Sequence, residues 1–105
     1  MTEKQVNLKR ERSAEYKARR EERAAIRAHI NELKSAPCTD CGGTFDPVCM
    51  DFDHRPGEGK RAEVSALIWS GWARLDRVLS EIAKCDLVCS NCHRLRTKKR
   101  REASL

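Results

Sequence analysis

Residues 85–97 read CDLVCSNCHRLRT, and together with CTDC at residues 38–41 they decide how this chain folds. Each CxxC unit leaves a gap of two residues, so that both thiolates of one turn can point at a single metal ion. Two such units complete the tetrahedral set of four thiolates that structural zinc prefers. The sequence therefore predicts a Zn²⁺ site with four ligands, which are Cys38, Cys41, Cys89 and Cys92.

The size and composition of the chain favour a domain that is held together by a metal. Its 105 residues are 39% apolar and 36% charged, so a large hydrophobic core is not available. Domains this small commonly need a metal or disulfides. No apolar stretch approaches the roughly 20 residues of a membrane span, and the polar N-terminus does not resemble a secretory signal. We therefore expect a cytoplasmic location without membrane contact, where paired cysteines are more often metal ligands than disulfides.

The cysteines allow other interpretations, which the sequence supports less well. A thioredoxin-like redox CxxC needs a βαβ context, and the chain has none. Cys49 and Cys85 fall outside the two CxxC units. We expect both to be ordinary half-buried thiols, with Cys85 as an alternative spare ligand. A redox function for this pair is a third interpretation.

The pattern around the cysteines predicts an α+β fold with two short strands. Apolar and polar residues alternate over residues 48–53, which predicts a half-buried strand with Val48, Met50 and Phe52 on one face. Residues 87–89 are expected to form a second strand that returns to pair with the first. The glycine-rich stretch between residues 55 and 61 is expected to be a loop.

Three helices are also expected. Ile26, Ile30 and Leu33 recur at helical spacing, so residues 22–34 are expected to dock as a helix, with the earlier residues as a solvated or DNA-facing extension. Four apolar residues predict an amphipathic helix over residues 72–84, which begins after Ser70 and Gly71. The basic run from His93 to about Arg101 predicts a closing helix.

The net charge of +6 is spread unevenly along the chain. Residues 1–36 carry a balance of +4, residues 37–93 a balance of −3, and residues 94–105 a balance of +5. Two basic arms around an acidic centre are expected if the arms bind a polyanion and the centre binds cations, although solvated tails would have the same composition. We therefore divide the chain into a basic helical extension (1–36) and a domain with a basic C-terminal helix or tail (37–105).

Two of the three histidines occupy positions that suggest chemistry. His54 follows Asp53 at the end of the predicted strand, and His93 directly follows the last zinc ligand, Cys92. If the zinc ion joins the two turns, Asp53 and His93 could share a second cation, with His54 free beside it. A neutral imidazole is available near neutral pH to take a proton from water, and a divalent cation can neutralise charge on a phosphate. Either histidine alone is more simply explained by a structural hydrogen bond.

Three segments resemble the zinc-knuckle branch of the HNH endonucleases, which are common in phage genomes. These are CTDCGG (38–43), MDFDHRPG (50–57) and EIAKCDLVCSNCHRLRT (81–97). The resemblance implies a ββα-metal fold in which His54 is the general base and Asp53 and His93 hold the catalytic Mg²⁺, Mn²⁺ or Ni²⁺. Many members have an asparagine nine residues before the last histidine, where this chain has Lys84. Lys84 could instead contact phosphate, or Asn91 could replace that asparagine in bracing the loop.

The resemblance implies an endonuclease that hydrolyses DNA phosphodiester bonds, by nicking or double-strand cutting. It also suggests a phage setting, in which such nucleases assist DNA packaging by the terminase. The N-terminal helix is where the terminase, a second copy of the chain or further DNA would bind. The rival interpretation is a non-catalytic zinc-knuckle DNA-binding or adaptor protein. Six basic residues are expected to contact the DNA backbone, namely Lys84, Arg94, Arg96, Lys98, Lys99 and Arg100.

Overall fold

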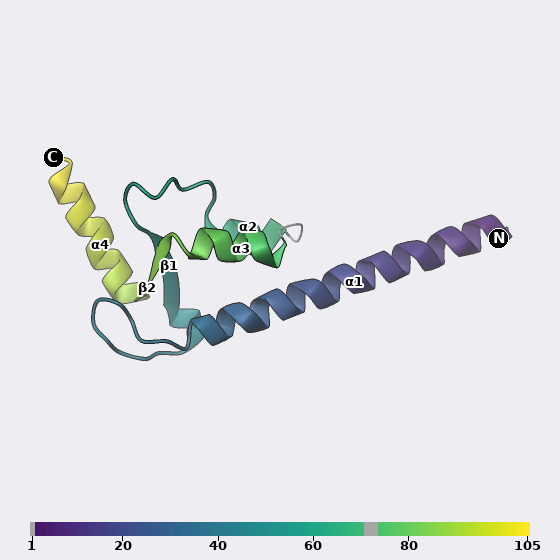
Figure 1. Cartoon of the computed structure of the whole chain (residues 1–105), viewed down its shortest axis with the longest axis horizontal. Helices are drawn as coiled ribbons and strands as arrows, with labels where there is room; N and C mark the ends of the chain where they lie inside the picture. The colour runs from purple at the N-terminus through teal and green to yellow at the C-terminus, as the bar shows by residue number, and fades with distance from the viewer. Residues whose placement is uncertain (1, 71–73) are drawn as a thin grey trace.

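The computed structural model describes residues 2–70 and 74–105. It confirms the predicted α+β fold, with a two-stranded sheet and a helix that follows it (Figure 1). The predicted start of the second helix, at residues 71–72, lies outside the described residues. The elements in chain order are α1 (Glu3–Leu33), the 3-10 turn η1 (Pro47–Cys49), β1 (Met50–His54), α2 (Val64–Ser70), α3 (Leu75–Ile82), β2 (Cys85–Cys89) and α4 (Ser90–Ala103).

Helix α1 is continuous, because residues 3–33 contain neither proline nor glycine. It begins with a capping box, in which the Thr2 side chain accepts from the backbone of Gln5 and the Gln5 side chain accepts in return. Only its last turns are packed: Ile26 and Ile30 are buried, whereas residues 7–22 are exposed. The docked helix over residues 22–34 is therefore confirmed. The preceding part of α1 extends away from the rest of the molecule (Figure 1).

The two strands pair antiparallel, as predicted, with Met50 opposite Cys89 and His54 opposite Cys85. The prediction was wrong at the start of the first strand. Val48 lies in η1 and is 85% exposed, because Pro47 opens a 3-10 turn and the Asp46 side chain accepts from the Val48 backbone. The strand therefore begins at Met50, which is fully buried.

Short helix α2 was not expected from the sequence, and it completes the main core. Its buried side chains, Val64 and Leu67, meet the end of α1 and helix α3. We call this group the helical cluster; it consists of Ile26, Ile30, Val64, Leu67 and Val78. The expected amphipathic helix is present as α3, which carries Val78 at 0% exposure. The end of α1 thus belongs to the same packed body as the helices between the strands.

A second group of buried side chains lies around the two CxxC turns. We call it the knuckle cluster; it consists of Cys38, Met50, Val88 and Cys89. Helix α4 follows β2 without a break, because Cys89 is also the N-cap of α4 and its Sγ accepts from the backbone N–H of Cys92. The strand pair therefore lies between α4 on one side and α2 and α3 on the other (Figure 1). Among the described residues, no helix is both long and apolar enough to cross a membrane.

Candidate metal centre and nucleic-acid interface

The four cysteines of the CxxC units come together as predicted. Their sulfur atoms all lie within 4.8 Å of one another. Gly42, at a φ of 72°, supplies the left-handed backbone that the first turn requires, and its N–H donates to the Cys38 carbonyl at 2.9 Å. The Cys89 N–H donates to the Cys38 sulfur at 3.3 Å, which ties the second turn to the first. This donor set and its closed geometry fit a structural Zn²⁺ ion.

The electrostatics of the cluster favour a cation. Burial opposes ionisation of the Cys38 thiol, but backbone N–H groups of Cys41, Cys89 and Asp40 outweigh it and lower its pKa to about 6. The pKa of Cys92 is raised to about 12 by its hydrogen bond to Cys89, by burial and by the neighbouring thiols. Without an ion, a thiolate at Cys38 therefore discourages ionisation of Cys92. A dication would remove this conflict, because it stabilises all four thiolates together.

The two remaining cysteines lie outside this cluster. Cys85 is half-buried, as expected, and its thiol donates to the Glu81 carbonyl oxygen at 3.3 Å. Burial and the nearby Glu81 carboxylate raise its pKa to about 11, which makes it a poor ligand and a poor nucleophile. The expectation for Cys49 was wrong, because this residue ends the exposed turn η1 and is itself exposed.

Strand β1 brings Asp53 and His93 side by side. Successive residues of a strand point to opposite faces, so Asp51 and Asp53 share the face that α4 covers. The His93 ring lies between them: its Nδ1 is 3.0 Å from Asp51 Oδ2, and its Nε2 is 3.6 Å from Asp53 Oδ1. Two donor atoms at the latter distance can share one divalent cation. The sequence interpretation missed Asp51, although its spacing of two from Asp53 was the available signal.

Two arginines of α4 bind the Asp53 carboxylate. Arg100 donates to both of its oxygens, at 2.9 and 2.8 Å, and Arg96 donates to Oδ2 at 3.0 Å. Arg96 also donates to Asp40 and Asp86. Burial alone would raise the pKa of Asp53, but the hydrogen bonds from Arg100 and Arg96 outweigh it and hold the pKa below its usual value. Asp53 is therefore ionised and paired, and a cation there must replace at least part of this pairing.

His54 lies on the opposite face of β1 from Asp53. Its Nε2 is 2.9 Å from Oε2 of Glu81 in α3, and its side chain is only 9% exposed. The structure thus brings Asp53 to His93 but directs His54 elsewhere. Glu81 also accepts from Lys84 at 2.6 Å; the hydrogen bonds from Lys84 and His54 outweigh its burial and lower its pKa to about 2. No sequence signal linked Glu81 to His54, since 27 residues separate them.

The six predicted DNA contacts fall into two groups. Lys84, Arg96 and Arg100 are bound within the protein: Lys84 holds Glu81 and the carbonyl of Gly59, and the two arginines hold carboxylates. Lys84 thus ties α3 to the loop that follows His54. The other three are exposed on α4, where Lys98 also pairs with Glu102 at 3.7 Å; they are Arg94, Lys98 and Lys99.

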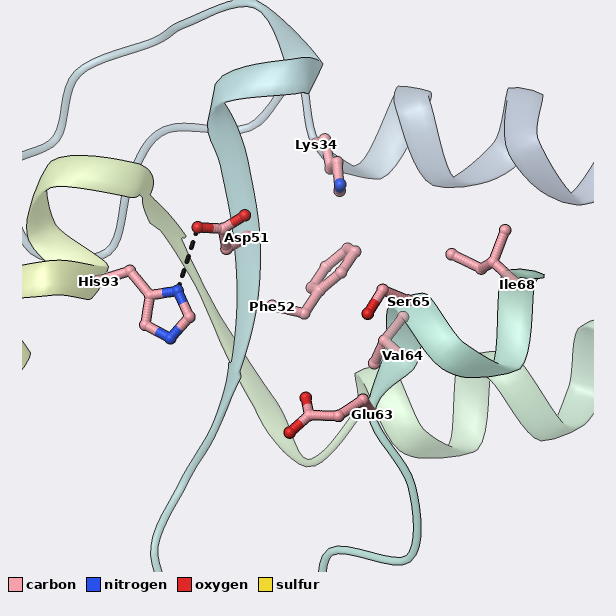
Figure 2. A pocket seen from close by; sticks show the side chains of 8 residues that line it. All are labelled: Lys34, Asp51, Phe52, Glu63, Val64, Ser65, Ile68 and His93. Carbon is pink, nitrogen blue, oxygen red and sulfur yellow. Dashed lines mark hydrogen bonds and ion pairs between the residues drawn. The ribbon is translucent and has the colours of Figure 1, made fainter. Parts of the chain in front are cut away.

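A pocket of about 210 Å³ opens beside β1, between this strand, α2 and the end of α1. Figure 2 shows Asp51 and His93 on one side of the strand and Phe52 on the other, with Glu63 and Ser65 across the opening. Because β1 pairs only with β2, its other edge is free of strand partners within the described residues. A ligand along this edge would have access to side chains of both faces of β1.

Comparison of the chain with protein-family models, with curated proteins and with solved structures finds no match.

Proposed function

We propose that this protein is a metal-dependent DNA endonuclease of the HNH type, with a structural zinc ion in a ββα-metal fold. The observation that carries the proposal is the position of His93. This residue directly follows zinc-ligand candidate Cys92, and its Nε2 lies 3.6 Å from Asp53 Oδ1. This pair supports the proposal because an imidazole nitrogen and a carboxylate oxygen at this separation can share one divalent cation.

The donor pair of Asp53 and His93 fits a second divalent cation. An anionic oxygen and an imidazole nitrogen suit Mg²⁺, Mn²⁺ or Ni²⁺. Such a cation would neutralise charge on the phosphate and on the leaving oxygen. Arg100 binds Oδ1 of Asp53, so the cation would have to replace this hydrogen bond, and the 44% exposed Arg100 side chain would then turn toward solvent. Its guanidinium would then be available to a DNA phosphate.

His54 is proposed as the general base. The Glu81 carboxylate can only accept a hydrogen bond, so it favours the form of His54 that carries a proton on Nε2. Nδ1 then keeps its lone pair and can take a proton from water. Since His54 and Asp53 point to opposite faces of β1, the scissile phosphate would have to approach along the free edge of the strand.

Exposed cations on α4 would supply the affinity for DNA. Arg94, Lys98 and Lys99 lie on one short helix that begins at the zinc knuckle. Phosphate contacts of this kind are independent of sequence and weaken with salt. Weak sequence preference is therefore expected. The exposed part of α1, residues 7–22, is the place we propose for a further partner, such as a phage terminase or a second copy of the chain.

The test is cleavage of supercoiled plasmid by zinc-loaded protein with added Mg²⁺, Mn²⁺ or Ni²⁺. His54→Ala should lower the cleavage rate about 10²- to 10⁴-fold, the usual contribution of a general base. Asp53→Ala should abolish stimulation by the added metal. The matched control is His29→Ala, which removes a histidine of α1 far from the site in sequence, and should cut like the parent. A His54→Ala variant with parental activity would exclude His54 as the base.

The rival is a zinc-knuckle protein that binds DNA without cutting it. Two observations favour it: His54 faces away from Asp53, and Arg96 and Arg100 already neutralise the Asp53 carboxylate. Both proposals predict salt-dependent DNA binding. Only the nuclease predicts a second bound cation and new DNA ends. Protein that binds plasmid, retains zinc and produces no nick with any of the three metals would favour the rival.

A further inference from the structure

We infer that Asp51 is a positioning residue for His93, which it holds with the Nε2 lone pair directed at Asp53. The inference rests on the proposed function in one respect only, namely that His93 is a ligand of a divalent cation. The Asp51 carboxylate approaches Nδ1 of His93 at 3.0 Å, across 42 residues of sequence.

The chemistry of the two groups determines which nitrogen carries the proton. An ionised carboxylate accepts hydrogen bonds and cannot donate, so the nitrogen that faces Asp51 must carry the hydrogen. In a neutral ring the hydrogen is then on Nδ1, and the lone pair is on Nε2. Nε2 is the atom that lies 3.6 Å from Asp53 Oδ1. The lone pair and Asp53 Oδ1 could therefore share a cation, which would have to replace the hydrogen bond that Arg100 donates to the same oxygen.

The backbone explains why Asp51 can perform this role. Asp51 and Asp53 are two residues apart on one strand, so both project toward α4. His93 lies in the first turn of α4, directly after the zinc-ligand candidate Cys92, and this position limits how its ring can move. The ring is thus held from both sides. In metal sites, a carboxylate on the second nitrogen of a ligating histidine fixes the ring and makes it a stronger donor.

If the contact between Asp51 and His93 only stabilised the fold, its loss would change the free energy of unfolding little and leave metal affinity unchanged. The side chains of Asp51 and His93 are 42% and 35% exposed, and exposed ion pairs contribute little to stability. Asp51 also lines the pocket beside β1 together with His93, where solvent and ions have access (Figure 2). We therefore expect substitution of Asp51 to change metal affinity much more than folding.

The test uses zinc-loaded protein with Mn²⁺ as the probe for the second cation. Asp51→Ala should weaken Mn²⁺ binding about 10- to 100-fold, the usual effect of removing such a carboxylate. In ¹⁵N NMR spectra recorded before Mn²⁺ is added, the neutral ring of His93 should carry its proton on Nδ1 in the parent and lose this preference in Asp51→Ala. The control is Asp76→Asn, which changes an exposed carboxylate on α3 and should alter neither measurement.

The outcomes separate this inference from the proposed nuclease. Asp51→Ala with parental Mn²⁺ affinity, or with an unchanged His93 tautomer, would overturn the role of Asp51, whether or not the protein cuts DNA. Parent protein that binds no Mn²⁺ would overturn it as well. If Mn²⁺ binding and the tautomer depend on Asp51 but no DNA is cut, the inference stands and the nuclease proposal fails.

Discussion

Removal of the zinc ion should unfold the strand pair and the start of α4, while the helical cluster keeps more of its structure. The perturbation is a strong chelator, or Cys89→Ser, which removes one of the four clustered thiols. Without the ion, the described part of the knuckle cluster retains two fully buried large apolar side chains, Met50 and Val88, with the half-buried Leu87 packed against them. The helical cluster contains no cysteine among its five buried members.

The magnitudes show why two side chains are not enough. Burial of Met50 and Val88 contributes about 1.5–3 kcal/mol each, or roughly 3–6 kcal/mol together. The two strands contain five residues each, ten in all. Fixing the backbone of these ten residues costs roughly 10–20 kcal/mol at about 1–2 kcal/mol per residue. A structural zinc ion contributes about 10–16 kcal/mol, which closes the gap.

Hydrogen exchange followed by mass spectrometry measures the effect segment by segment. Amide protection in β1, β2 and the first turn of α4 should fall by several orders of magnitude after chelation and return when Zn²⁺ is added back. The control is Cys49→Ser, which removes an exposed thiol outside the cluster and should leave both zinc content and protection unchanged. Full protection of β1 and β2 in zinc-free protein would refute the reasoning, because the strand pair would then be stable without the ion.

Three further predictions concern individual side chains. Ile30→Ala should lower the free energy of unfolding by about 2–5 kcal/mol because Ile30 is 3% exposed, whereas Leu8→Ala, at 43% exposure, should change it little in urea titrations. The Glu81 pKa is lowered to about 2, so the ionised carboxylate stabilises the folded protein at neutral pH. The stability difference between the parent and Glu81→Gln should therefore be largest above about pH 4.5 and shrink as the pH falls toward 2. Thermal unfolding at several pH values measures this difference. A stability difference between the parent and Glu81→Gln that stays the same between pH 4.5 and pH 2 would contradict this prediction. Replacing Lys98 and Lys99 with glutamine should make the slope of log K for DNA binding against log salt concentration shallower by about 0.9 for each phosphate that the variant no longer neutralises, measured by fluorescence anisotropy.

Several features of the fold follow from short-range patterns and could be predicted. A two-residue gap between cysteines already brings two sulfur atoms together. To predict that the two CxxC turns meet, we had to assume only that they bind the same ion. The alternation of Met50 and Phe52 predicted a strand, and the basic run after His93 predicted a helix. Prediction failed at Val48, where Pro47 and Asp46 form a local turn, and it missed α2 altogether.

The candidate site depended on information that spacing does not contain. Asp53 and His54 are neighbours in sequence, yet they lie on opposite faces of β1 and contact α4 and α3 respectively. Side chains of consecutive strand residues point to opposite faces, so Asp53 and His54 are separated in space although they are neighbours in sequence. The pairing of β1 with β2 determines which helix lies over each face. The same holds for Arg96 and Arg100: the sequence suggested them as DNA contacts, and only the tertiary structure revealed that both also bind Asp53.

The sequence by itself determined that four cysteines converge and that a basic helix follows them, since both features arise within a few consecutive residues. Only the tertiary structure decided which carboxylate each histidine meets: Asp51 and Asp53 for His93, and Glu81 for His54. The physical reason is that these contacts join side chains from different elements, so they depend on strand register and on where each helix packs. Patterns of composition and spacing specify neither the strand register nor the packing of each helix.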